Sequence, residues 1–372
     1  MHPQDLITRF PLVPRPRPSC PPLPERIHRL SELARRADEE GNLTSASATF
    51  NLAALIASDV GLPRLARQLC RRHSDLYLAL RPLPGQAACY ALEPLLNLAN
   101  QYLREGRGGR AVQLLDDLDE AISSRSDIVI GDIPVPAATL TATDEAHRHV
   151  VEWMHHNRIV DGARALGRAG RWPEASARLR QAGLIGDRIF EGRQTAVIAR
   201  AAQDDHAGAT ALLNHTVIEE AWERAVVSCL IVVCRTGGSA RNGAAAVTAM
   251  LRDYQGIDET TEKPLFRTRL GLAVIDTSGI GSRAARTVAH NLIARTVNAQ
   301  DGYTSRAVLA HPACGILMSD QQRDALTAVI DTSGLGAGRP LPADLAAELT
   351  DALDLAETVI VRTAGSGQAD QR

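Results

Sequence analysis

The stretch NLAALIASDVGLPRLARQLC (51–70) decides the fold of this chain. A helix rich in small residues ends at Gly61, and five residues later Ala66 begins the packing face of a second helix. Glycine can adopt the left-handed conformation that ends a helix, and alanine lets two helix backbones approach closely. The same order recurs in NLANQYLREGRGGRAVQLLD (97–116) and DGARALGRAGRWPEASARLR (161–180). The pattern therefore predicts a series of antiparallel helical hairpins.

Composition and apolar spacing extend this prediction to most of the chain. Aromatic residues make up only 3% of the sequence, and the apolar residues are mainly alanine, leucine and valine. Such small side chains suit closely packed helices better than sheets, which favour β-branched and aromatic residues. Apolar residues also recur at spacings of three and four from residue 25 onward. We expect an all-α fold.

The distribution of proline and polar residues suggests four parts. Eight of the 19 prolines lie within residues 1–24, which predicts an extended arm, either a partly disordered leader over the first helices or a docking arm. We expect helical repeats over 25–220, interrupted by a long ordered loop at 126–143 that has room for a short hairpin. Further helical hairpins packed on the repeats are expected over 221–362, followed by a flexible tail over 363–372.

Three hairpins resemble the tetratricopeptide repeat (TPR), in which a bulky residue, a small residue, a turn glycine and a second small residue recur. The residues at these places are Phe50, Ala54, Gly61 and Ala66, then Leu95, Ala99, Gly106 and Ala111, then Ile159, Ala163, Gly170 and Ala175. The likeness, to TPR-like proteins of the actinobacterial type, covers about residues 45–215, although insertions interrupt the usual period of about 34 residues. It implies a right-handed superhelix of helical hairpins, an α-solenoid.

The resemblance also implies a binding surface, because the first helix of each TPR hairpin lines a concave groove. The family's ligand-facing positions correspond to Asn51, Asn100, Arg104, Asn157, Arg164 and Arg168. Asparagine can pair with peptide main-chain amides, and arginine can hold carboxylates with two parallel hydrogen bonds. This reading predicts a non-catalytic adaptor or scaffold that binds a peptide segment or partner protein. A solvated polar surface accounts for the same residues equally well.

A second candidate site lies on one predicted helix face. Glu145, His149, Glu152 and His156 are spaced by four, three and four residues, and these residue types bind metals. A metal there would make the chain a metal-dependent helical enzyme. The favoured interpretation is a solvated face with pairs of side chains four residues apart, so no metal or other cofactor is expected.

A duplicated segment, AVIDTSGIG (273–281) and AVIDTSGLG (328–336), offers a further alternative. Its Asp276 and Asp331 are similar to the Asp-Thr-Gly carboxylates of aspartic proteases, but helical surroundings do not provide that geometry. We interpret both copies as helix ends with a capping Asp-Thr-Ser group and a glycine exit.

Charge and cysteine usage narrow the function classes. The formal charge is −2, which disfavours direct nucleic-acid binding, and no phosphate loop or nucleophile elbow is present. No apolar run is long enough to cross a membrane, and six scattered cysteines suggest reduced thiols in a cytoplasmic protein. A regulatory sensor that acts on a separate DNA-binding partner stays open as an alternative to the adaptor.

Overall fold

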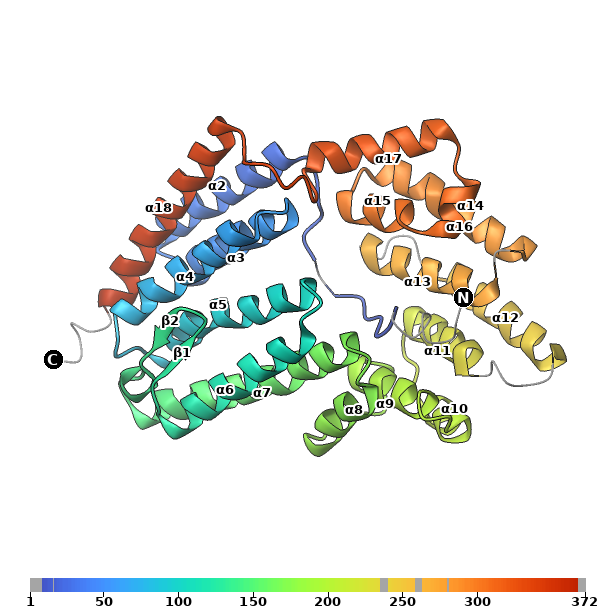
Figure 1. Cartoon of the computed structure of the whole chain (residues 1–372), viewed down its shortest axis with the longest axis horizontal. Helices are drawn as coiled ribbons and strands as arrows, with labels where there is room; N and C mark the ends of the chain where they lie inside the picture. The colour runs from blue at the N-terminus through green and yellow to red at the C-terminus, as the bar shows by residue number, and fades with distance from the viewer. Residues whose placement is uncertain (1–8, 16, 235–239, 258–262, 280, 367–372) are drawn as a thin grey trace. The chain divides into compact units, whose positions relative to one another are not determined.

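The computed structural model describes residues 9–15, 17–234, 240–257, 263–279 and 281–366, with no side chains described at 240–242 and 366. Within these ranges the chain is almost entirely α-helical, which confirms the predicted all-α class (Figure 1). The chain forms two compact units. Unit 1 combines the described part of 1–21 with residues 166–333, and unit 2 combines residues 22–165 with the described part of 334–372.

Unit 2 is built from consecutive antiparallel helices and one helix from the other end of the chain. Its helices are α2 (Leu23–Glu40), α3 (Leu43–Asp59), α4 (Pro63–Ala79), α5 (Gly85–Arg104), α6 (Gly108–Ser124), most of α7 (Asp144–Arg168) and α18 (Ala343–Ser366). Each of α2 to α5 packs on the next helix in sequence, and α18 packs on α2, α3 and α4 (Figure 1). Residues 363–366 of the predicted tail are therefore helical, and residues 367–372 lie outside the described residues.

The turn glycines of the predicted hairpins occupy the conformation that their spacing suggested. Gly61, Gly106 and Gly170 all have positive φ, between 75° and 83°. Close packing also requires glycine at position 61, because a Cβ atom there would lie 3.0 Å from the main-chain nitrogen of Gly338. The Gly338 N–H donates to the Val60 carbonyl at 2.8 Å. The turn that contains Gly338 therefore binds directly to the end of α3.

The segment 126–143, expected to be an ordered loop, contains a small antiparallel hairpin. Strands β1 (Ile128–Ile130) and β2 (Ile133–Val135) pair with Ile128 opposite Val135, and the short 3-10 helix η1 (Ala137–Thr139) follows. One face of the hairpin is buried in the unit 2 core through Ile130, Ile133 and Val135.

Unit 1 holds the remaining helices and the described part of the arm. Its helices are α8 (Trp172–Gln181), α9 (Glu191–Ala201), α10 (His206–Asn214), α11 (Ala221–Cys234), α12 (Ala240–Gln255), α13 (Pro264–Ser278), α14 (Arg283–Ala299), α15 (Gly302–Leu309), α16 (Pro312–Leu317) and α17 (Asp320–Ser333). Successive pairs such as α8 and α9, or α11 and α12, pack as hairpins. The core is formed by apolar side chains of these helices together with Phe10 and Leu12 of the arm.

The duplicated Asp-Thr-Ser-Gly segments end α13 and α17. Gly279 and Gly334 both have positive φ, as a glycine exit requires. The hydroxyl groups of Thr277 and Thr332 donate to the main-chain carbonyls four residues earlier, at 2.6 and 2.9 Å. The expected capping role of Asp276 is wrong, because its buried carboxylate instead pairs with Arg9 and His311.

Candidate anion-binding site

The described arm residues 9–15 and 17–20 are attached to unit 1 at both ends, which positions Arg17 between the two attachments. Phe10 and Leu12 are 5% and 3% exposed within the unit 1 core. At the other end, the Cys20 N–H donates to Asp301 Oδ2 at 2.6 Å, and the Gly302 N–H donates to the Cys20 carbonyl at 2.8 Å. Asp301 is also the N-cap of α15, so the arm is held at the first turn of that helix.

Arg17 lies against the same first turn of α15. Its guanidinium carbon is 4.1 Å from the centroid of the Tyr303 ring, within the range of a cation–π contact. Arg306 lies three residues after Tyr303 on α15, and its guanidinium carbon is 6.0 Å from the same centroid. Tyr303 is buried, whereas both arginines are exposed. A buried aromatic ring therefore supports two exposed guanidinium groups.

Two further arginines face the same region. Arg269 belongs to α13, and Arg168 is the last residue of α7. The pKa of Arg269 is lowered, first by partial desolvation and then by the positive charges of Arg17, Arg168 and Arg306. We call Arg17, Arg168, Arg269 and Arg306 the arginine cluster. The charges of Arg17, Arg168 and Arg306 therefore lie close enough to Arg269 to disfavour its charged form.

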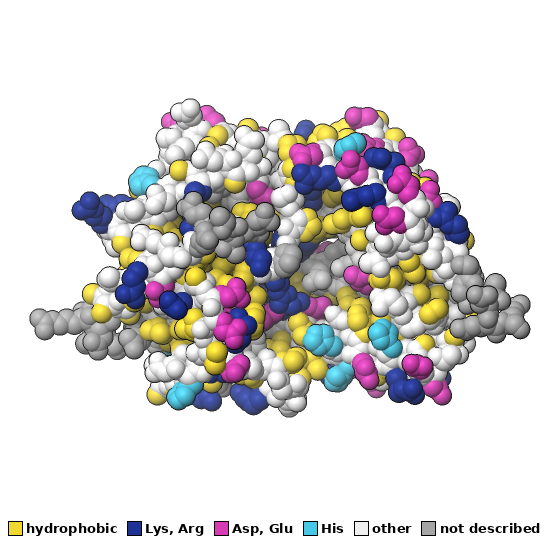
Figure 2. Space-filling model, turned by 180° about the vertical axis from the view of Figure 1, so that it is seen from behind, with side chains coloured by type: hydrophobic (Ala, Val, Ile, Leu, Met, Phe, Trp, Pro, Cys, Tyr) yellow, Lys and Arg dark blue, Asp and Glu magenta, His cyan; other side chains and the backbone are white. Residues whose placement is uncertain are grey.

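Three members of the arginine cluster have no carboxylate partner among the described residues. Within the described ranges, Arg17, Arg269 and Arg306 form no ion pair with Asp or Glu. Elsewhere cationic and anionic side chains lie side by side, as the face in Figure 2 shows. A cluster of like charges is electrostatically unfavourable by itself, and a bound anion would offset that repulsion.

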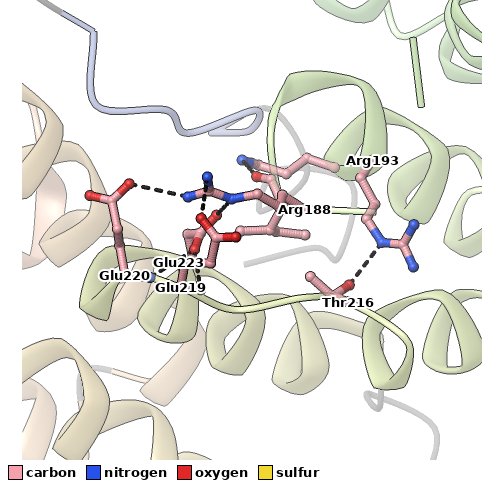
Figure 3. A network of polar contacts seen from close by, with 8 residues as sticks. Arg188, Arg193, Thr216, Glu219, Glu220 and Glu223 are labelled. Atoms are coloured by element: carbon pink, nitrogen blue, oxygen red, sulfur yellow. Dashed lines mark hydrogen bonds and ion pairs between the residues drawn. The ribbon is translucent and has the colours of Figure 1, made fainter. Parts of the chain in front are cut away.

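Arg188, elsewhere in unit 1, is paired with three glutamates (Figure 3). Its guanidinium contacts Glu219 at 2.6 Å, Glu220 at 3.2 Å and Glu223 at 2.8 Å. Burial alone would raise the pKa of Glu223, but hydrogen bonds from Arg188 and from the N–H groups of Glu219 and Glu220 lower it below its ordinary value. The Arg188 guanidinium already contacts three carboxylates and is not available to a ligand carboxylate, so the role of this network is structural.

Arg193 is likewise satisfied within the fold. Its Nε donates to Thr216 Oγ1 at 2.9 Å, and its terminal nitrogens donate to the carbonyls of Gly186, Leu212 and His215 (Figure 3 shows the Thr216 contact). These acceptors include the end of α10, where main-chain carbonyls lack helical partners. Arg193 therefore ties α9 to α10.

The six positions derived from the TPR resemblance fall in different surroundings. Asn51, Asn100 and Arg104 belong to α3 and α5 of unit 2. The Asn51 side-chain oxygen accepts a hydrogen bond from Asn97 at 2.9 Å, Asn100 is exposed, and Arg104 bonds to Ser58.

The other three positions lie along α7. Asn157 donates to the Trp153 carbonyl of its own helix at 2.7 Å, and Arg164 pairs with Asp161 one turn away. Of the six, Arg168 is the residue that joins the arginine cluster. Arg17, Arg269 and Arg306 were missed, because no spacing in the sequence connects the arm with α13 and α15.

The candidate metal-binding residues also lie on α7. Glu145, His149, Glu152 and His156 are all exposed. Among the described residues, no group of three or more His, Cys, Asp or Glu side chains is arranged to hold a metal ion.

Comparison with known proteins identifies no relative for this chain. No family model, no curated protein and no solved structure matches it. In the described part of the chain, no helix is sufficiently long and apolar to span a membrane.

Proposed function

We propose that this protein is a non-catalytic helical-repeat protein that binds an acidic segment of a partner protein, and that the arginine cluster of unit 1 is its binding site. The observation that carries the proposal is the position of two guanidinium groups, those of Arg17 and Arg306, on one buried tyrosine, with the charges of Arg168 and Arg269 nearby. Arginine is suited to this role because its planar donors match carboxylate oxygens in pairs. The helical hairpins would then act as a TPR-like scaffold for an adaptor.

An acidic peptide fits the site better than a nucleic acid. The arginine cluster is local, and the whole chain has a formal charge of −2, so no extended basic surface is expected to follow a phosphate backbone. The one aromatic ring at the site, Tyr303, is buried beneath arginines and cannot stack on a base. Adjacent carboxylates on a short peptide are the chemistry that four neighbouring guanidinium groups recognise.

Fluorescence polarisation with a labelled hexaglutamate peptide tests the proposal. The double substitution Arg269→Gln/Arg306→Gln should weaken binding about tenfold or more, because it removes half of the cluster's charge. A hexaglutamine peptide should not bind. Added salt should weaken the hexaglutamate complex, since exposed charges are screened.

The matched control is Arg64→Gln/Arg110→Gln, which removes the same charge from two exposed arginines of unit 2. This control should bind hexaglutamate like the unmodified protein. Equal affinity of both double variants would refute the site, and tighter binding of duplex DNA than of hexaglutamate would refute the proposed ligand class.

A further inference from the structure

The first described residues of the arm bind unit 1 in the manner of a peptide ligand. The side chains of Arg9 and Arg15 pair with Asp276 of α13 and Glu191 of α9. Between them, Phe10 and Leu12 enter the unit 1 core. Buried apolar side chains between charged anchors also occur where a peptide segment binds a receptor surface.

Gln194 binds the main chain of this segment. Its side-chain Oε1 accepts from the Leu12 N–H at 2.7 Å, and its Nε2 donates to the Leu12 carbonyl at 2.8 Å. A third hydrogen bond, from Nε2 to the Ile189 carbonyl at 2.8 Å, orients the amide. These contacts do not depend on the identity of the Leu12 side chain, so Gln194 would bind the main chain of any extended segment in this register.

The carboxylate that binds Arg9 is held in place by the unit itself. His311 Nε2 donates to Asp276 Oδ1 at 2.9 Å, while the Cys314 N–H donates to His311 Nδ1 at 3.3 Å. The two contacts assign the His311 proton to Nε2 and leave Asp276 Oδ2 for the arginine. Asp276 therefore keeps its orientation independently of the arm.

Proline lowers the cost of binding such a segment. Pro11 and Pro14 fix φ at two positions of the arm before it binds, which reduces the conformational entropy lost on binding. Between these two prolines, Gln194 bonds both the N–H and the carbonyl of Leu12.

We propose that the surface of α9 and α13 that holds residues 9–15 is a peptide-binding groove for a segment of a partner protein. The sequence pattern of that segment is arginine, aromatic, proline, aliphatic, two variable residues and arginine. The arm of the chain is its intramolecular occupant, and a partner segment with the same pattern replaces it. The groove residues are Glu191, Gln194 and Asp276, all outside the arginine cluster, so this inference does not depend on the proposed function.

Binding of the labelled peptide Arg-Phe-Pro-Leu-Val-Pro-Arg to the full chain tests the groove. The unmodified protein should bind it weakly, because its tethered arm competes at an effective concentration on the order of millimolar. The variant Phe10→Ala/Leu12→Ala, which weakens the arm, should bind the peptide about tenfold or more tightly than the unmodified protein does. Adding Gln194→Ala to that variant should abolish binding, whereas adding Gln321→Ala, an exposed glutamine of α17, should not.

Two further measurements cover the case in which the arm variant does not fold. First, a protease site inserted between the exposed Pro18 and Ser19 allows the arm to be cut after folding, and excess labelled peptide should then exchange into the groove. Second, a peptide with an N-methyl group on its leucine lacks the N–H that Gln194 accepts, and it should exchange about tenfold more weakly. Failure of the labelled peptide to exchange, or equal exchange of the methylated peptide, would overturn the proposal.

Discussion

The side-chain amide of Gln194 bonds both the N–H and the carbonyl of Leu12, a residue 182 positions earlier in the chain. Gln194 is fully buried, and all of its described hydrogen bonds are to main-chain groups. Because the arm forms neither helix nor sheet at this point, the amide supplies the partners that secondary structure provides elsewhere.

Replacing this amide should destabilise unit 1. Gln194→Ala leaves buried main-chain groups of Leu12 and Ile189 without hydrogen bonds, so we expect the free energy of unfolding to fall by about 3 kcal/mol. Urea denaturation followed by tryptophan fluorescence would measure the change. The exposed Gln321→Ala should lie within about 0.5 kcal/mol of the unmodified protein, and an equally small effect at Gln194 would contradict the structure.

His73 should make the stability of unit 2 depend on pH. Its ring is buried and stacks on Phe50 with centroids 5.0 Å apart, and burial lowers its pKa from 6.5 to about 3. Below pH 6.5 the unfolded chain therefore binds a proton that the folded chain does not, so this contribution to stability is progressively lost between pH 6.5 and 3. The slope approaches about 1.4 kcal/mol per pH unit within that window.

The variant His73→Phe tests this assignment, because phenylalanine keeps an aromatic ring and cannot titrate. Melting temperatures at pH 7.5 and 5.0 should differ less for His73→Phe than for the unmodified protein. His290→Asn, at an exposed position, serves as the control and should preserve the original pH dependence. Parallel pH profiles for His73→Phe and the unmodified protein would disprove the buried neutral state.

Glu223 should contribute stability that is also lost as pH falls, but at lower pH than the contribution of His73. Hydrogen bonds lower its folded pKa below the ordinary 4.5 in spite of burial, so its contribution is fully present above pH 4.5 and is lost as pH falls through the folded pKa. Glu223→Gln should therefore unfold more easily than the unmodified protein at pH 7, and the two should converge in acid. Chemical denaturation at pH 7 and pH 3.5 measures both differences, and the exposed Glu145→Gln should show neither.

Gly61 and Gly106 distinguish two ways in which a side chain at a turn can destabilise the fold, through backbone strain and through steric overlap. Gly61→Ala would place a Cβ atom at a positive φ and 3.0 Å from the Gly338 nitrogen. Gly106→Ala would have the same backbone cost, because φ is +75°, but no described atom lies within 4 Å of its Cβ. We expect a loss of about 1 kcal/mol for Gly106→Ala and about 2–3 kcal/mol for Gly61→Ala, measured by thermal denaturation. Equal losses would show that the loop at Gly338 does not approach α3 closely.

Local patterns in the sequence predicted the helical class and the turns at Gly61, Gly106 and Gly170. Helix periodicity and a glycine exit depend on residues within a few positions of one another, so one sequence is enough to recognise them. The same reasoning failed for Asp276, because a capping role was inferred from its neighbours alone. Its actual partners, Arg9 and His311, are 267 and 35 residues away.

By itself, the sequence determined that this chain folds into α-helical hairpins. Only the tertiary structure decided that the arm belongs to unit 1, that Gln194 binds its main chain, and that Arg17 joins Arg168, Arg269 and Arg306. The physical reason is range. A helix is stabilised by hydrogen bonds four residues apart, whereas each of these contacts joins segments that meet only after the cores have packed.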